Sequence, residues 1–488
     1  MAGGHEERWT RAQLLRRATA AGIGLATVGG LRLGQPAAAW AAAQPPVHAF
    51  ASRPDLRPPV LSVLHHDREA TADGLLFLAP LSGPGARGPM LVDDAGHVVY
   101  FHGTRPVVAL NFRAATYRGK PVLTWWEGKT EHGLGEGTHV ILDSSYRVVR
   151  RLPAGNGHPS DLHEFLLTDR NTALVTAWEH VETDLRKLGG KRNGVVVGGI
   201  VQELELPSGR VLFEWRSLDH VGLGESHALV GPQFDYFHVN SIERDADGNY
   251  LVSARNTWAI YKLDGETGRV LWRLGGKKSD FAMGRGTVFA WQHDARSHPG
   301  NLISLFDDGG DPRVQPYSKA LVLALDHTRR RATLHRRYVH HPPAVAHALG
   351  STQILPNGNV LVGWGTSPYV SEYTDGGRLV FDATLPEGGQ NYRALRFPWT
   401  GQPYFRPKAA VASHDGSRVL YASWNGATEV AQWQLESGPS ASRLSGGQKV
   451  PRRGFETAIA IPAHAKAARA AALDGDGAVL GRSHVVEL

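Results

Sequence analysis

The sequence of 488 residues contains no cysteine and only three methionines. The lack of cysteine excludes disulfide bonds, thiolate metal sites and a cysteine nucleophile. Beyond the first 43 residues, no segment stays apolar for long enough to span a bilayer as a helix. Hydrophobic residues still make up 42% of the chain and charged residues 20%, so the chain can bury a large core and is not typical of disordered proteins.

The charge of the chain is modest and is not concentrated in one place. The formal net charge is +7, and no run of lysine and arginine with interleaved aromatic residues is present. Nucleic acid is therefore not expected as a partner. The small positive excess is compatible with a preference for anionic small molecules.

Residues 1–43 are typical of an export signal peptide. Arg11, Arg16 and Arg17 precede a weakly apolar stretch from Ala18 to Leu31, and small residues suited to cleavage follow. The low hydrophobicity and the arginine pair favour twin-arginine export over the general secretory route. A membrane anchor is the alternative, but the stretch is too short to span a bilayer. We therefore expect a secreted or extracytoplasmic protein with no stable membrane span after cleavage.

From residue 60 onward the sequence pattern is that of β-strands. Short apolar runs such as Gly74–Leu78 and His97–Phe101 lie between glycine, proline, asparagine and aspartate. The run Val201–Leu206 alternates apolar with polar residues, as a half-buried strand does. A composition that favours helix occurs only near Ala465–Leu473. The sequence predicts an all-β protein.

Repeated segments predict how these strands are organised. Pro207–Trp215 resembles Glu266–Leu274 at an offset of 59 residues, and segments that could begin an inner strand recur along the chain. They lie near Pro89–Met90, Asp161–His163, Phe237–His238, Gln292–His293, Gly350–Ser351 and Pro407–Lys408. Six such units predict a six-bladed β-propeller, and two or three packed β-sandwiches are the alternative.

The predicted boundaries follow from this repeat. Residues 44–88 form an N-terminal extended or β segment, and residues 89–440 form the propeller. Ser440–Gln448 is rich in serine and glycine and is expected to be a loop. Residues 449–488 form a C-terminal β element or close a blade.

Histidines recur at the start of the predicted inner strands. His238 and Asn240 lie on one face of an extended segment, because residues two apart share a face. His293 takes the same position 55 residues later, and His163 in Ser160–Glu164 is a weaker third copy. Repeated units that place a reactive side chain at the same point predict a common central site. The alternative is that these side chains form hydrogen bonds between blades.

Three arginines lie in corresponding loops, namely Arg255, Arg313 and Arg393. Their forked donors suit an anion, so together with the histidines they predict an anion-binding site. The histidines lack the tight spacing and the carboxylate partners of a strong metal signature, and we therefore expect no metal and no cofactor.

These residues resemble the motifs of the bacterial arylsulfotransferases, the sulfate-ester-dependent kind found outside the cytoplasm. The matching segments are Phe237–Ile242, Gln292–Ala295, Phe306–Gly309, Tyr392–Leu395, Trp272–Gly276 and Ser423–Glu429, and the last two resemble the actinobacterial and fungal branch. The resemblance implies a six-bladed propeller that transfers a sulfuryl group from an aryl sulfate to a phenol without a nucleotide sulfate donor. It also implies that His238 and His293 bind the sulfuryl group and act in acid–base catalysis, and that Arg313 is the oxyanion clamp.

The sequence departs from the family pattern at one position. Characterised members form a sulfohistidine on a histidine just after a Gly-aromatic-Gly segment. Here Gly363–Gly365 is followed by no histidine, and Tyr369 lies close to the expected position. We expect the carrier to be Tyr369, His238 or His293, or the transfer to be direct. A non-catalytic propeller that binds a small anion or a cell-surface partner is the alternative function.

Overall fold

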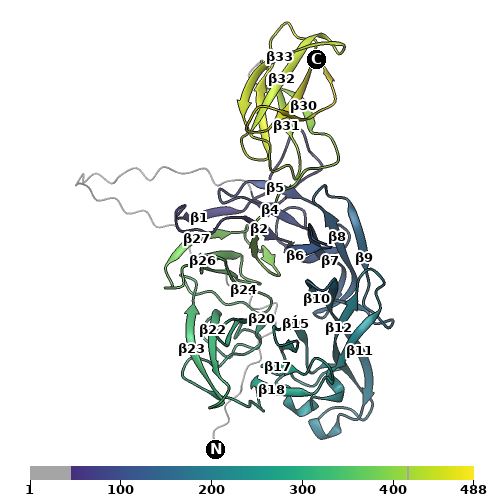
Figure 1. The fold of residues 1–488 in the computed structure, drawn as a ribbon, viewed down its shortest axis with the longest axis vertical. Coiled ribbons are helices and arrows are strands. Elements are labelled where there is room, and N and C mark those ends of the chain that lie inside the picture. Colours follow the sequence, from purple (N-terminus) through teal and green to yellow (C-terminus); the bar gives the residue numbers. More distant parts are fainter. Residues whose placement is uncertain (1–45, 415–416) are drawn as a thin grey trace, which may run out of the picture. The chain divides into compact units, whose positions relative to one another are not determined.

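The computed structural model describes residues 46–414 and 417–488 (Figure 1). Strands dominate these residues, and the helices among them are the short 3₁₀ turns η1 (Arg186–Leu188), η2 (Ser217–Asp219) and η3 (Leu223–Glu225). The predicted all-β class is thereby confirmed. The predicted export signal at residues 1–43 lies outside the described residues. Within the described ranges, no helix has the length and apolar character needed to cross a membrane.

Four-stranded antiparallel units follow one another along the chain. The first full unit contains β6 (Val108–Tyr117), β7 (Lys120–Glu131), β8 (Leu134–Asp143) and β9 (Val148–Leu152). The next contains β10 (Ser160–Leu167), β11 (Thr172–Thr183), β12 (Gly194–Glu205) and β13 (Val211–Arg216), with β14 (Gln233–Asp235) parallel to β12. A bridge between β8 and β10 joins the two units into one sheet.

Three further units repeat this pattern. One contains β15 (Val239–Arg244), β16 (Tyr250–Ala254), β17 (Ala259–Leu263) and β18 (Val270–Gly275). Another contains β20 (His293–His298), β21 (Leu302–Asp307), β22 (Lys319–Asp326) and β23 (Arg331–Tyr338), with β19 (Ala282–Met283) at its edge. The third contains β24 (Ser351–Ile354), β25 (Val360–Gly363), β26 (Tyr369–Tyr373) and β27 (Leu379–Thr384), with β1 (Ser62–His66) at its edge.

One sheet joins segments that are far apart in the sequence. It has the order β29 (Leu395–Phe397), β2 (Leu75–Leu78), β4 (Met90–Val92) and β5 (Val98–Phe101). A small second pairing joins β28 (Gln390–Asn391) to β3 (Pro80–Ser82). The prediction of an inner strand at Pro89–Met90 is wrong. Met90 begins β4, which is the third strand of this sheet, and β29 is the strand at the edge.

The first strands of successive units contact one another in order. The contacts join β6 to β10, β10 to β15, β15 to β20, β20 to β24, β24 to β29 and β29 to β6. Apolar clusters lie between neighbouring sheets, where Leu251 and Ile260 pack with Leu305 and Leu321 in one buried group. The core is therefore divided among the interfaces between sheets, and the ends of the first strands lie together.

The C-terminal strands form two sheets of their own. One contains β30 (Lys408–His414), β31 (Ser417–Ser423) and β34 (Glu456–Ala460); the other contains β32 (Gln432–Ser440), β33 (Arg443–Pro451), β35 (Ala467–Leu473), β36 (Val479–Arg482) and β37 (Val486–Glu487). The segment at Pro407–Lys408 therefore begins a C-terminal strand and not the predicted inner strand. Residue 440 lies at the end of β32, which pairs with β33 and β35, so it does not separate two sheets.

Candidate functional site

Three histidines from three different units meet at the ends of the first strands. His163 lies in β10, His238 directly precedes β15, and His293 begins β20. One ring nitrogen of each lies within 4.8 Å of the corresponding nitrogens of the other two. The structure thus brings together all three histidines that the sequence analysis selected.

An irregularity in each strand accompanies its histidine. The register shifts between Ser160 and Phe165 in β10, between Val239 and Ser241 in β15, and between His293 and Arg296 in β20. His238 itself has a positive φ of 53°, a conformation that costs an ordinary residue roughly 1 kcal/mol or more. Because such bulges re-aim side chains at the rim of a sheet, they explain how residues of separate strands point at one centre.

Each histidine is held by its own aspartate. The Nδ1 atoms donate to Asp161 at 2.6 Å, to Asp235 at 2.5 Å and to Asp308 at 2.7 Å. An imidazole that donates from Nδ1 keeps an unshared electron pair on Nε2. Across residues 46–414 and 417–488, none of the three Nε2 atoms has a hydrogen-bond partner. The cluster therefore presents three nitrogen lone pairs in fixed orientations.

These aspartates were missed in the sequence analysis, although two of them stand close to their histidines. Asp161 precedes His163 by two residues, and Asp235 precedes His238 by three. An aspartate two or three residues before a histidine could therefore have been used to predict a histidine whose ring is held by a carboxylate. Asp308 follows its histidine by 15 residues and reaches it only because β20 and β21 pair.

The cluster is largely buried, and burial sets its protonation. His293 is 1% exposed and His163 3%. Burial lowers the pKa of His163 and lowers that of His293 well below its ordinary value, and the nearby charge of Arg255 acts in the same direction on His293. Burial also raises the pKa of Asp308 well above its usual range. Both His163 and His293 are therefore neutral near pH 7.

Arg255 is the predicted arginine that lies beside the cluster. Its guanidinium stacks on Trp291 at 4.8 Å and donates to the backbone oxygens of Asp311 and His347. Burial lowers its pKa, and the nearby carboxylates of Asp308 and Asp235 oppose that shift. Arg255 thus places a positive charge close to two of the three aspartates that hold the histidines.

Two predicted residues lie in other surroundings. Arg313 is exposed, and its guanidinium donates to the backbone oxygens of Gln315 and Pro316. Tyr369 begins β26, the third strand of its unit, and its ring stacks on His340 at a centroid distance of 3.9 Å. Neither Arg313 nor Tyr369 is bonded to the histidines, although the loop of Arg313 lies beside Arg255, whose guanidinium donates to the backbone oxygen of Asp311.

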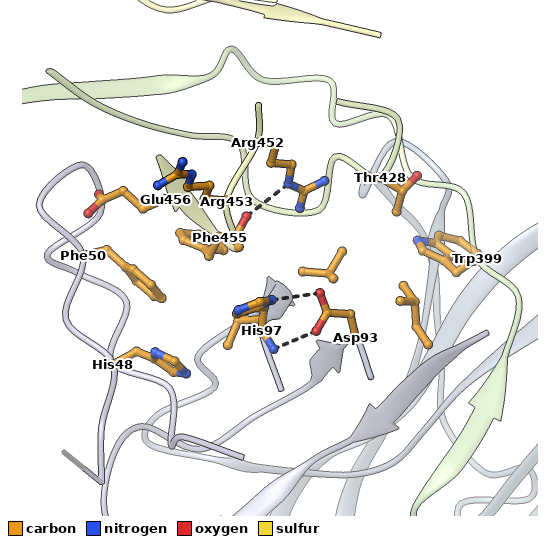
Figure 2. Close-up of a pocket in the computed structure, with 14 residues that line it drawn as sticks. His48, Phe50, Asp93, His97, Trp399, Thr428, Arg452, Arg453, Phe455 and Glu456 are labelled. Atoms are coloured by element: carbon orange, nitrogen blue, oxygen red, sulfur yellow. Dashed lines mark hydrogen bonds and ion pairs between the residues drawn. The ribbon is translucent and has the colours of Figure 1, made fainter. Parts of the chain in front are cut away.

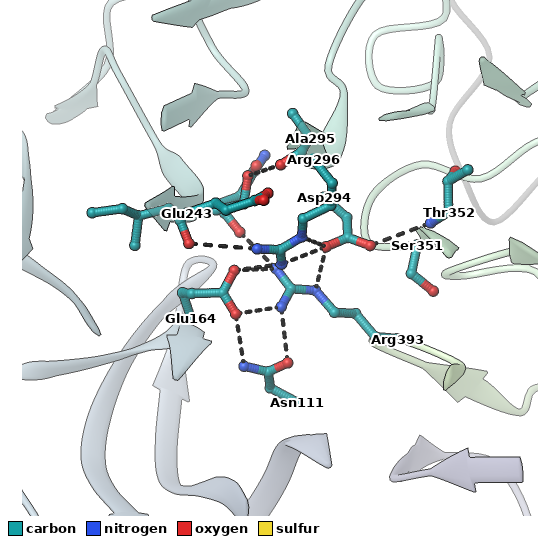
Figure 3. Close-up of polar contacts among 12 residues, drawn as sticks. Asn111, Glu164, Glu243, Asp294, Ala295, Arg296, Ser351, Thr352 and Arg393 are labelled. Carbon is teal, nitrogen blue, oxygen red and sulfur yellow. Dashed lines mark hydrogen bonds and ion pairs between the residues drawn. The ribbon is translucent and has the colours of Figure 1, made fainter. Parts of the chain in front are cut away.

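Arg393 belongs to a buried ion network and not to an open anion site. Its Nη1 donates to Glu164 at 2.7 Å and to Asn111 at 2.8 Å, and Arg296 donates to Glu164 and to Asp294 at 2.5 and 2.6 Å (Figure 3). The two Nη atoms of Arg393 are bonded to protein groups, its Nε lies 3.4 Å from Asp294 without a hydrogen bond, and the residue is 2% exposed. Arg393 was predicted to bind substrate, but its observed contacts are with other residues of the protein.

Asn240 also makes contacts within the protein. Its Nδ2 donates to the backbone oxygen of Gln292 at 2.6 Å and so joins β15 to the neighbouring unit. The hydroxyl of Tyr392 donates to the backbone oxygens of His163 and Asn240. These hydrogen bonds join separate units, which is the alternative role that the sequence left open for such side chains. They fix the strands that carry the histidines.

A large cavity lies elsewhere, away from all the predicted site residues. It has a volume of about 880 Å³ and is lined by His48, Asp93, His97, Trp399 and Arg452, among others. Asp93 is bonded to His97 (Figure 2), and Arg452 donates to the backbone oxygen of Gly454. Of the polar groups that line it, Asp93, His97 and Arg452 have partners, whereas His48 Nε2 has none. The histidine cluster gathers three imidazoles from separate units and is the better candidate site.

Comparisons with known proteins agree with the resemblance noted in the sequence. The profile of a family described as arylsulfotransferase (ASST) matches residues 113–385, more than half of the chain. No curated protein matches the chain.

Solved structures give weaker similarities. A protein of unknown function from Bacteroides caccae is 12% identical with a TM-score of 0.42, over 66% of this chain and 98% of that one. The β-propeller domain of Cps50 (Swd1) from Myceliophteria thermophila is 12% identical with a TM-score of 0.32, over 66% and 98%. Virginiamycin B lyase from Staphylococcus aureus is 9% identical with a TM-score of 0.27, over 69% and 87%. These scores are too low to carry any conclusion about this chain.

Proposed function

Because the chain belongs to the arylsulfotransferase family, whose profile covers residues 113–385, we propose that it transfers a sulfuryl group from an aryl sulfate ester to a phenol. The observation that supports this most is the cluster of His163, His238 and His293 beside Arg255. All four residues lie within the matched range. No nucleotide sulfate donor and no nucleic acid is part of the proposal.

The chemistry suits the residue types of this cluster. Transfer breaks the bond between sulfur and the aryl oxygen of the donor and forms a bond between sulfur and the phenol oxygen of the acceptor. The proton of the acceptor passes to the leaving phenolate. Negative charge spreads over the sulfuryl oxygens and the leaving oxygen, so cationic stabilisation and positioning supply most of the catalysis, as in phosphoryl transfer.

Arg255 and the histidines divide these tasks. The forked guanidinium of Arg255 suits the planar spread of sulfuryl oxygens. A neutral imidazole accepts a proton near pH 7, and a phenol of pKa about 10 loses its proton readily only with such help. His238 has the most exposed side chain of the three, at 11%, and is the best placed to exchange protons with a bound phenol.

The missing histidine after Gly365 favours direct transfer between donor and acceptor. Tyr369, which the sequence analysis offered as a carrier, stacks on His340 in the third strand of its unit. We propose that donor and acceptor bind together at the histidine cluster and that no sulfated protein accumulates. Intact-mass analysis after incubation with an aryl sulfate alone tests this step, and a stable gain of one sulfuryl group would contradict it.

Release of 4-nitrophenol from 4-nitrophenyl sulfate tests the proposed function itself. We expect release to require added phenol, because the cluster needs an acceptor, and to be lost in the His293→Ala variant. The exposed His335 lies in β23, and the His335→Ala variant is the matched control. Release without phenol would indicate a hydrolase. No release from folded protein would favour the alternative of a propeller that only binds an anionic ligand or a partner.

We propose that the units close into a six-bladed propeller. The pairing of β29 with β2 and the cyclic order of contacts among the first strands support this closure. The chain has no cysteine, so a pair introduced at Leu75 and Phe397, which are opposed in β2 and β29, has no competing thiol. We expect the Leu75→Cys, Phe397→Cys protein to form this disulfide on mild oxidation, because opposed residues are about 4.5–5.5 Å apart. A protein that stays reduced would contradict the closure.

The cellular location is also a proposal. We propose that residues 1–43 direct twin-arginine export and are then removed. The amino-terminal sequence of the protein recovered outside the cytoplasm tests this, and a protein that retains residues 1–43 there would contradict it.

A further inference from the structure

The three histidines form a donor set that the proposed transfer does not by itself explain. One ring nitrogen of each lies within 4.8 Å of those of the other two, and because each Nδ1 is bonded to an aspartate, the nitrogen that remains for a ligand is Nε2. None of the three Nε2 atoms is among the buried polar atoms that lack a partner, so each stays open to solvent, as the ligand atoms of a metal site with an entry path are. A cation at their centre satisfies all three at once.

The groups behind the histidines support the same conclusion. Each Nδ1 donates to an aspartate, namely Asp161, Asp235 or Asp308. An aspartate behind a ligating histidine fixes the ring and makes it a better ligand, and metal-bound histidines almost always have such a partner. Three carboxylates are gathered here, and Arg255 is the cation that lies against two of them.

We propose that His163, His238 and His293 bind one divalent first-row transition ion, with Zn²⁺ as the best fit. Neutral imidazoles suit Zn²⁺ and disfavour Mg²⁺ and Ca²⁺, which prefer oxygen ligands. Zinc–nitrogen bonds are about 2.0–2.1 Å, so two ligating nitrogens lie at most ~4.2 Å apart. The nitrogens lie within 4.8 Å of one another, and small rotations of the rings bring them to that range.

Three protein ligands leave one position open, as in catalytic zinc sites. An oxygen donor would take it, either water, a sulfuryl oxygen or a phenolate. This last step rests on the proposed function. With the ion bound, the acid–base role given above to His238 would pass to the ion, which would supply the positive charge and lower the pKa of a bound phenol while the imidazoles hold it.

The sequence predicts no metal because the histidines, which are 75 and 55 residues apart, lack tight spacing and carboxylate partners. A compact metal signature needs ligands close together in the chain. Here the ligands come from three strands of separate units, and only their packing brings the nitrogens together.

The test is the metal content of the purified full-length protein, followed by removal with a chelator and reloading. We expect about one ion per chain, taken up again from Zn²⁺. Reloading with Co²⁺ should give the visible bands of a four- or five-coordinate ion with nitrogen ligands. This measurement needs no variant. A wild-type protein that takes up neither ion stoichiometrically would overturn the proposal.

Variants locate the ion. His293→Ala should lose binding, and Asp308→Asn should weaken it roughly 10- to 100-fold, because the aspartate orients the ligand. His335→Ala is the control, since this histidine is exposed on β23 and should bind the ion unchanged. Equal affinity in folded His293→Ala and wild type would place the ion elsewhere and overturn the assignment. If His293→Ala does not fold, the affinity of Asp308→Asn and the Co²⁺ spectrum decide.

Activity separates this proposal from the proposed function. A protein that binds the ion but transfers no sulfuryl group would keep the metal site and refute the transferase. A metal-free protein with full transferase activity and no affinity for Zn²⁺ would support the transferase and refute the metal site.

Discussion

The Arg255→Ala variant is expected to lose roughly 10²- to 10³-fold in kcat/KM for transfer from 4-nitrophenyl sulfate to phenol. Arg255 places a guanidinium against the aspartates that hold His238 and His293, and it is ordered by Trp291 and by two backbone oxygens. Removal of one preorganised cation from a site where negative charge develops has an effect of this size. The measurement is steady-state kinetics with both substrates varied.

Arg313→Ala is the informative comparison. The sequence resemblance made Arg313 the oxyanion clamp, but its guanidinium bonds to its own loop at Gln315 and Pro316. We therefore expect Arg313→Ala to change kcat/KM less than tenfold. Arg255→Lys should restore only part of the activity, because an ammonium lacks the fork. A large loss in Arg313→Ala with little loss in Arg255→Ala would show that the loop rearranges around the substrate and that the clamp is Arg313.

The Glu164→Gln variant is expected to lower the free energy of unfolding by about 3–5 kcal/mol near pH 7. Glu164 is fully buried and is bonded to Arg393 and Arg296, so its neutral replacement leaves two buried guanidinium groups with too little negative charge. Because first strands of separate units meet in this network (Figure 3), the loss should weaken the contacts among them. Chemical denaturation of both proteins measures the difference.

The pH dependence of stability gives a second measure of the same network. Although burial by itself would raise the pKa of Glu164, the charges of Arg296 and Arg393 lower it to about 2. A carboxyl whose pKa is lowered on folding contributes stability above its unfolded pKa and loses that contribution as the pH falls through its folded pKa. The difference between wild type and Glu164→Gln should therefore shrink between about pH 4.5 and pH 2. The exposed Glu266→Gln variant should match wild type throughout. A constant difference over this range would contradict the assignment.

The class of structure and most of the repeat can be predicted from the amino-acid sequence alone. Period-2 runs and turn residues are local signals, so the strands at β10, β15, β20 and β24 begin within two residues of the predicted positions at Asp161, Phe237, Gln292 and Gly350. The three histidines were found for the same reason, since each marks the start of one of these strands. Local propensity failed at Ala467–Leu473, where an alanine-rich segment that favours helix is the buried strand β35 because it pairs between β32 and β36.

Which of the candidate residues form one site depends on how the sheets pack. The pairing of β29 with β2 joins residues more than 300 positions apart, and no local pattern encodes such a contact. The arginines looked alike in the sequence, yet Arg393 is neutralised by Glu164, Arg313 is bonded to its own loop, and Arg255 lies at the histidines. Whether the charge of an arginine is neutralised depends on which groups, distant in the sequence, pack against it. The packing of the sheets therefore sets the role of each arginine, and it also brings the three imidazoles together.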